Sequence, residues 1–73
     1  MRTAYDLLLT APDDQITRCR LAHSAIGAGE WADAAHFLRN AAGESAGTAW
    51  GQDAAALASF CQARVGAGPV PRA

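Results

Sequence analysis

This sequence lacks any block of residues that carry charge of one sign. Six basic and seven acidic residues are spread along 73 residues and leave a formal net charge of −1. A protein that binds nucleic acid by neutralising phosphates needs a concentration of basic residues, and an acidic mimic of nucleic acid needs the opposite. The charge pattern therefore argues against both classes.

The N-terminal stretch MRTAYDLLLTAPDD lacks the long apolar run of a signal peptide or a membrane span. Its three leucines meet a proline and acidic residues almost at once, whereas a membrane span needs about 20 apolar residues. We therefore expect a cytoplasmic protein without a membrane partner. In that compartment Cys19 and Cys61 would stay reduced, and small buried thiols are ordinary residues of a core.

Residue types that carry out catalysis or bind metals are few. The cysteines and histidines of the chain are Cys19, Cys61, His23 and His36. Cys19 and His23 lie one helical turn apart, as zinc ligands or a nucleophile and its base could, but the spacing matches no common zinc module. The sequence has no glycine-rich loop for an oxyanion or a phosphate, and Asp13 and Asp14 are better explained as acids in a first helical turn. We predict no enzyme activity, no metal and no cofactor.

What the chain does contain is alanine. About half of the residues, 51%, are apolar, and much of this share is alanine, which favours helix more than any other side chain. A chain of 73 residues is one small domain that buries roughly 60% of the surface exposed when unfolded, so its stability should be a few kcal/mol. These features predict an all-α fold, a small bundle of three to four antiparallel helices.

Capping residues divide the chain into four predicted helices. They cover residues 4–11, 12–28, 30–42 and about 48–65. Thr3 and Asp6 have the spacing of a capping box at the start of the first helix. The loop at 43–47 is followed by Thr48 which, like Ser45, is a candidate cap for the last helix.

Two glycines join the second and third predicted helices. Gly27 and Gly29 can adopt the left-handed backbone that a tight reversal needs, so the two helices should form an antiparallel hairpin at the centre of the bundle. We assign residues 1–66 to a single all-α domain. Residues 67–73 hold glycine and proline in place of helix formers and are predicted to be a flexible C-terminal tail.

Each predicted helix has an apolar face. In the first helix the face is formed by Tyr5, Leu8 and Leu9. The second helix is apolar on two sides, one of Ile16, Cys19, His23 and Ile26 and a smaller one of Leu21, Ala25 and Ala28. In the third helix one face holds Trp31, Ala34, Ala35, Leu38, Ala41 and Ala42, and the opposite face holds Asp33, His36, Arg39 and Asn40. The fourth helix repeats Trp50, Ala54, Leu57, Cys61 and Val65.

Seven residues of the hairpin share the spacing of a known structural repeat. They are Leu21, Ala22, Gly29, Trp31, Ala34, Leu38 and Ala41. Through them residues 15–48, about half of the chain, resemble a tetratricopeptide repeat. The resemblance implies two helices packed through small residues, and a role in holding peptides or partner proteins on the face of the first of them. That face would be Ile16, Cys19, His23, Ile26 and Gly27.

The chain also departs from the repeat pattern. It has Arg18 in place of an early aromatic, Ala25 in place of a tyrosine and Ala46 in place of the closing proline. The positions one period later, Val65 and Gly68, do not continue the repeat. Since repeat units need neighbours to bury their faces, we expect the first and fourth helices to cap the hairpin, or the protein to form a homodimer.

Protein–protein interaction is the function class that the sequence favours. We predict a non-enzymatic module that acts through an apolar helix face, because the chain has two tryptophans, a helix that is apolar on two sides and no site chemistry. Aromatic and arginine side chains carry most of the binding energy at such contacts. The predicted partner-binding residues are Ile16, Cys19, Arg20, His23, Ile26 and Trp31, with Trp50 contributing if it is not fully buried.

Several roles within and beyond this class remain open. The protein could be a host adaptor that holds a peptide. It could instead be a small inhibitor encoded by a phage or another mobile element, such as an anti-CRISPR or other anti-defence protein. A further alternative is a helix-turn-helix DNA-binding regulator that places residues 31–39 in the groove of DNA. Because Arg39 is the one basic residue of that segment, we expect no nucleic acid partner.

Overall fold

The computed structural model describes residues 2–66 and confirms an all-α bundle built around a central helical hairpin. The helices are α1 (Ala4–Leu9), α2 (Ile16–Gly27), α3 (Trp31–Glu44) and α4 (Ala49–Gly66), and a short 3-10 helix, η1 (Asp13–Gln15), precedes α2. The tail predicted at residues 67–73 lies outside the described residues.

The predicted capping box starts α1. The hydroxyl of Thr3 accepts a hydrogen bond from the Asp6 amide at 3.1 Å, and the Asp6 carboxylate accepts one from the Thr3 amide at 3.2 Å. The helix ends at Leu9, two residues earlier than predicted, because Pro12 disfavours helical backbone in the residue before it. The Thr10 hydroxyl donates to the Asp6 carbonyl at 3.0 Å and closes the last turn.

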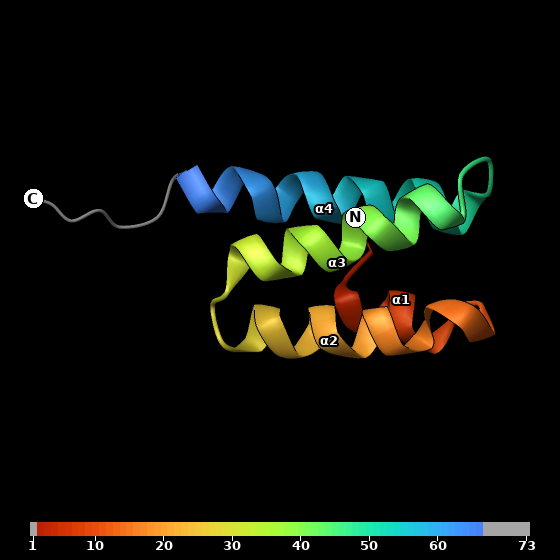
Figure 1. Cartoon of the computed structure of the whole chain (residues 1–73), viewed down its shortest axis with the longest axis horizontal. Coiled ribbons are helices and arrows are strands. Elements are labelled where there is room, and N and C mark those ends of the chain that lie inside the picture. The colour runs from red at the N-terminus through yellow and green to blue at the C-terminus, as the bar shows by residue number, and fades with distance from the viewer. Residues whose placement is uncertain (1, 67–73) are drawn as a thin grey trace, which may run out of the picture.

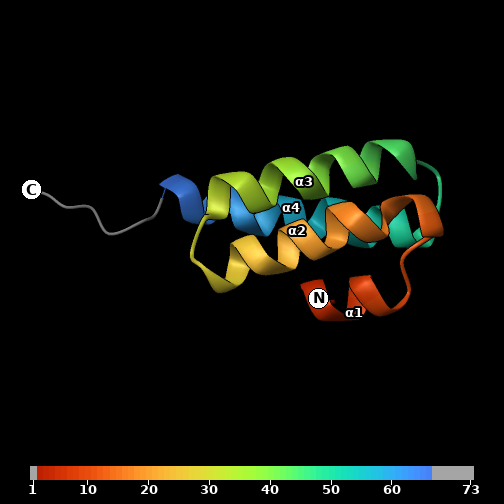
Figure 2. The ribbon, with the colours of Figure 1, turned by 60° about the horizontal axis from the view of Figure 1, so that its bottom comes forward.

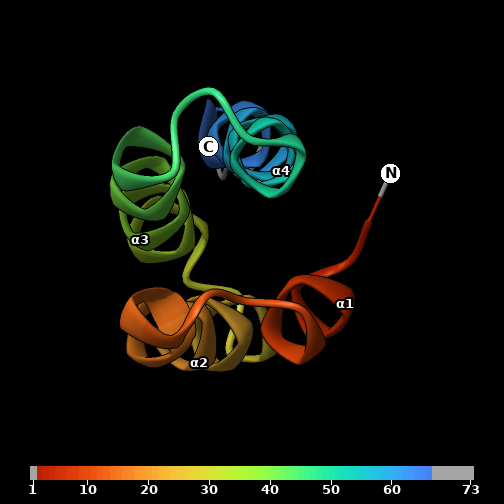
Figure 3. The same ribbon diagram turned by 90° about the vertical axis from the view of Figure 1, so that its right-hand side faces the viewer.

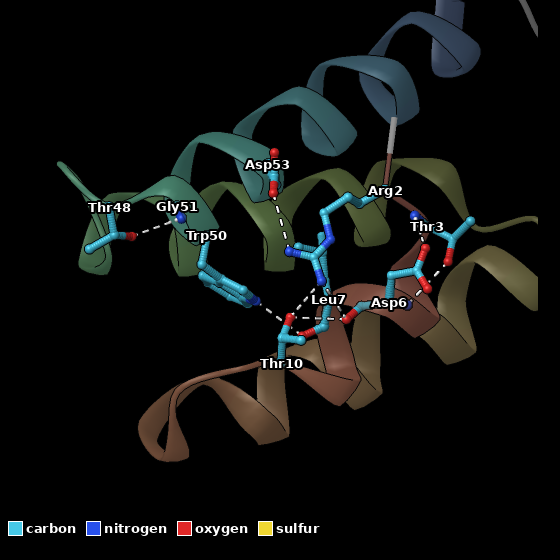
Figure 4. Close-up of polar contacts among 9 residues, drawn as sticks. All are labelled: Arg2, Thr3, Asp6, Leu7, Thr10, Thr48, Trp50, Gly51 and Asp53. Atoms are coloured by element: carbon cyan, nitrogen blue, oxygen red, sulfur yellow. Dashed lines mark hydrogen bonds and ion pairs between the residues drawn. The ribbon is translucent and has the colours of Figure 1, made fainter.

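Two side chains hold α1 against α4 (Figure 4). The indole Nε1 of Trp50 donates to the carbonyl oxygen of Leu7 at 3.0 Å in the interior, and this carbonyl is one of the last four of the helix, which lack a partner within it. Arg2 reaches Asp53 with one guanidinium nitrogen at 3.3 Å and the Thr10 hydroxyl with the other at 2.9 Å. A helix of six residues is therefore fixed on the bundle by contacts from α4 and from its own flanks.

The inward face of α1 differs from the prediction. Ala4 and Leu7 are buried and Leu8 packs on them, whereas Tyr5 and Leu9 are exposed. The expected apolar face of Tyr5, Leu8 and Leu9 was therefore wrong in two of its three residues. The helix contacts both α2 and α4, and the side that meets both is the one centred on Leu7.

The second predicted helix is divided near its start. Residues 13–15 form a 3-10 turn closed by a hydrogen bond from the Gln15 amide to the Pro12 carbonyl at 2.8 Å. The Gln15 side chain is buried and donates to Glu44 at 3.1 Å, while Arg18 donates to Gln15 at 3.0 Å and pairs with Glu44 at 3.1 Å. This network ties the start of α2 to the end of α3 and explains why α3 continues two residues beyond the predicted end.

A single face of α2 is buried. It consists of Cys19, Ala22 and Ala25. The second predicted stripe was wrong for Leu21 and Ala28, which are exposed, because α1 and α3 pack on this helix and leave its outer side to solvent. In the turn that follows, Gly29 has the predicted left-handed backbone at φ 75°, whereas Gly27 does not and is the last residue of α2.

The inward faces predicted for α3 and α4 are confirmed with one exception. The buried residues of the two helices are Ala34, Ala35, Leu38, Ala41, Trp50, Ala54, Leu57, Ala58 and Cys61, and Trp31 and Ala42 pack partly buried against them. Val65 is exposed because it lies in the last helical turn of α4. The Thr48 hydroxyl accepts from the Gly51 amide at 2.9 Å, so Thr48 is the predicted cap of α4.

The helices occupy the four corners of a bundle. Seen along the bundle, α1 lies diagonally opposite α3, and α2 lies opposite α4 (Figure 3). The antiparallel pairs α2–α3 and α3–α4 run the length of the molecule (Figure 1). Since α1 has 6 residues and α4 has 18, α1 lies beside the first turns of α2 and leaves the later turns uncovered on that side (Figure 2).

Candidate functional site

An apolar groove lies where α1 stops short of the end of the bundle. It has a volume of about 240 Å³, and we call it the open-corner groove. Its apolar lining comes from all four helices and consists of Ala4, Ile26, Trp31, Leu57 and Phe60. Arg2 and Thr3, which lead into α1, border it at one end. Binding sites are commonly concave and mostly apolar, and the groove has this character at a volume below the usual range of roughly 300–1,000 Å³.

Two aromatic rings form one wall of the groove. The ring centroids of Trp31 and Phe60 are 6.3 Å apart, with the planes at 79°, which is a favourable edge-to-face geometry. Trp31 is partly buried, and Phe60 keeps 40% of its surface exposed. Because one ring comes from the start of α3 and the other from the later half of α4, the α3–α4 packing sets the distance between them.

Arg64 lies over this aromatic wall. Its guanidinium carbon is 4.7 Å from the Trp31 ring centroid and 5.3 Å from that of Phe60, so it makes a cation–π contact with both rings. The ion pairs among residues 2–66 join Arg2 to Asp53 and Arg18 to Glu44. No described carboxylate is within ion-pair distance of Arg64.

Of the six predicted partner-binding residues, two line the open-corner groove. Ile26 and Trp31 line the open-corner groove, whereas Ile16 is partly buried elsewhere and Arg20 is exposed on α2. Cys19 has 1% of its surface exposed. Including it in a partner face was therefore a mistake, since it is a core residue.

The short first helix divides the predicted face. His23 is exposed, and its ring centroid is 6.1 Å from that of Tyr5 in α1. The α1–α2 contact thus reaches the middle of the predicted face, and Ile26, one turn further on, is where the groove begins. The sequence reasoning missed Phe60, although its position three residues after Leu57 was a signal that it could lie beside the buried stripe of that helix.

A second, wider groove runs between α3 and α4 on another side of the bundle. It has a volume of about 550 Å³ and is lined mainly by small residues, among them Ala42, Ala55, Ser59 and Ala63. Two of its polar lining residues are bonded to each other, since Arg39 donates to Gln62 at 2.7 Å. This groove has no aromatic wall and offers a weaker anchor than the open-corner groove.

Both cysteines are residues of the core. Cys19 and Cys61 are free and buried, and burial raises the pKa of both thiols, although Arg64 offsets part of this rise at Cys61. An activated cysteine needs a lowered pKa instead. No group of three or more His, Cys, Asp or Glu that could hold a metal occurs among residues 2–66.

Comparisons with known proteins add no relative. No family model, no curated protein and no solved structure matches the chain. The resemblance to a tetratricopeptide repeat therefore stays a prediction made from the residues of the hairpin. Within the described residues, no helix combines the length and the apolar character needed to cross a membrane.

Proposed function

We propose that this protein is a non-enzymatic interaction module that binds a segment of a partner protein in the open-corner groove. The observation that carries the proposal is the corner of the bundle that α1 fills only in part, where Ile26, Trp31 and Phe60 border an apolar groove that α1 is too short to cover. An amphipathic segment laid in a groove between helices is a common mode of recognition.

The exposed part of Phe60 is large enough to contribute to binding. A phenylalanine presents roughly 200 Å², so an exposed fraction of 40% corresponds to about 80 Å² of apolar surface. Burying that area stabilises a complex by about 2 kcal/mol at 25 cal/mol per Å². Trp31 and Ile26 add to it, because both are only partly buried by the bundle itself.

The proposal includes two roles that differ in the partner. An adaptor would hold a short peptide or a helix of a host protein in the groove. An inhibitor encoded by a phage or another mobile element, such as an anti-CRISPR or other anti-defence protein, would insert a surface feature of a larger complex there. The identity of the captured partner distinguishes the two.

A matched pair of substitutions tests the groove. Phe60 and Leu21 have 40% and 45% of their surface exposed, both lie within helices, and only Phe60 lines the groove. Glutamine at either position keeps a good helix former. We would immobilise the wild-type chain, Phe60→Gln and Leu21→Gln, capture proteins from a native lysate, and measure dissociation constants for each recombinant partner. Circular dichroism would show that all three chains are folded.

The expected result is that Leu21→Gln binds as the wild type does, and that Phe60→Gln binds at least tenfold more weakly. Tenfold is the effect of about 1.4 kcal/mol, less than the contribution worked out for Phe60. Equal binding by the folded Phe60→Gln chain would show that partners contact another surface. Failure of the wild-type chain to capture any partner would count against an interaction role as a whole.

A further inference from the structure

Arg64 lies against two aromatic residues that line the open-corner groove, although it is not itself part of the lining. Its guanidinium lies over the rings of Trp31 and Phe60 at 4.7 and 5.3 Å from their centroids. The N–H donors of a guanidinium match the two oxygens of a carboxylate, and contact with an aromatic ring does not use them. The aromatic wall thus holds a cation in a fixed place at the edge of an apolar groove.

Two of the other charged groups near the groove have partners within the chain. Arg2 is paired with Asp53 and bonded to Thr10, and the Asp6 carboxylate serves the capping box. Glu30, which directly precedes Trp31, forms no ion pair with Arg64. Among residues 2–66, Arg64 is therefore a basic group beside the aromatic wall of this groove that forms no ion pair.

We propose that the groove selects partner segments in which a carboxylate stands next to an apolar anchor. This inference rests on the proposed function and specifies the chemistry of the partner. The anchor would fill the space between Ile26, Leu57 and Phe60, and an aspartate or glutamate of the same segment would accept hydrogen bonds from Arg64.

The separation of Phe60 and Arg64 along α4 sets the spacing between the apolar anchor and the carboxylate of the partner segment. Arg64 comes four residues after Phe60, which is about 6 Å along a helix. A carboxylate at that distance from the anchor is two residues away in an extended segment, and three or four residues away in a helical one. The occupant is thus a short acidic and apolar segment of another protein, and the residue that gives this preference is Arg64.

A random 12-residue peptide library displayed on phage tests the preference directly. The library would be selected on the immobilised wild-type chain and on Arg64→Gln, Arg64→Glu and Arg20→Gln. Arg20 is an exposed arginine of α2 that, unlike Arg64, makes no cation–π contact with the aromatic wall, so Arg20→Gln is the matched control for loss of a positive charge. Enriched peptides are compared by their frequency of acidic and basic residues within four positions of an apolar one.

Peptides enriched on the wild-type chain should contain acidic residues within four positions of an apolar one several times more often than the unselected library does. Arg64→Gln should lose this preference, Arg64→Glu should reverse it toward basic residues, and Arg20→Gln should keep it. A synthetic peptide from the selection should lose about tenfold in affinity for the wild-type chain when its acidic residue becomes the amide, a change expected for a charge-assisted hydrogen bond. The same change should have little effect on binding to Arg64→Gln.

The possible failures separate the two proposals. Peptides that need Phe60 but show no acidic preference would overturn the role of Arg64 and leave the interaction module standing. Peptides that bind Phe60→Gln as well as the wild type would overturn both. If sedimentation shows a dimer of the wild-type chain that Phe60→Gln abolishes, the occupant is a second copy and the inference of an acidic partner segment is wrong.

Discussion

Replacing Gly51 by alanine should destabilise the fold, although the residue lies in a helix, where alanine is normally preferred. A Cβ atom on Gly51 would overlap the carbonyl oxygen of Ser45 and lie 2.8 Å from its carbonyl carbon. That carbonyl cannot move freely, because it accepts hydrogen bonds from the Thr48 amide at 3.2 Å and from the Thr48 hydroxyl at 2.7 Å. Alanine therefore requires the loop between α3 and α4 to shift.

Gly43 provides the matched control within the preceding helix. A Cβ atom there would meet nothing within 4 Å, so Gly43→Ala should gain the ordinary helix preference for alanine, about 0.5–1 kcal/mol. At Gly51 the same gain is offset by crowding, which typically costs 1–3 kcal/mol, and we expect a net loss of about 1 kcal/mol or more. The same chemical change should thus have opposite signs at the two positions.

Thermal unfolding followed by circular dichroism at 222 nm measures the difference. In a domain of this size, 1 kcal/mol shifts the Tm by about 4–8 °C, so the two variants should unfold about 10 °C apart, with the wild type between them. In urea titrations, the slope of the unfolding free energy against urea concentration should be the same for all three chains. The Tm shifts would then reflect changes in stability and not in the denatured state. The reasoning would be refuted if Gly51→Ala unfolded at or above the temperature of Gly43→Ala, since the loop carbonyl could then not lie against α4.

Two further predictions concern pH and thiol reactivity. Hydrogen bonds from Arg18, and then from Gln15, hold the pKa of Glu44 below its ordinary value of 4.5. The folded state therefore has the lower pKa, and the stabilisation is complete above the unfolded pKa and lost as the pH falls through the folded one. Urea titrations between about pH 5 and pH 3 should show a smaller loss of stability on acidification for Glu44→Gln than for the wild type, and equal losses would contradict the pairing. Because burial raises the pKa of the Cys19 and Cys61 thiols, iodoacetamide at neutral pH should label them far more slowly in the native chain than in denaturant, and rapid labelling of the native chain would contradict their burial.

The sequence predicted those helix starts and turns that depend only on residues close together in the chain. The capping box at Thr3, the cap at Thr48 and the reversal at Gly29 involve residues within a few positions of each other. The inward faces of α3 and α4 were predictable for a related reason. Each helix runs the length of the bundle and packs against a long neighbour, so its 3.6-residue period marks one continuous buried face.

The faces of α1 and α2 could not be predicted in this way. A six-residue helix is too short for periodicity to choose between Leu7 and Tyr5 as its inward residue, and the choice depends on the position of α4, whose Trp50 bonds to the Leu7 carbonyl. On α2, Leu21 looked like part of a second stripe. It is exposed because the neighbouring helices pack on the other side.

By itself the sequence determined the helical class, the order of the helices and the residues able to enter a core, because alanine content, caps and glycines act over short distances. The tertiary structure alone decided which of those residues meet. It placed Cys19 in the core, and it brought Ile26, Trp31 and Phe60 from three helices to the edge of one groove. The physical reason is a mismatch in length, since a first helix of 6 residues cannot cover a fourth helix of 18, and the uncovered corner is visible only when the helices are packed together.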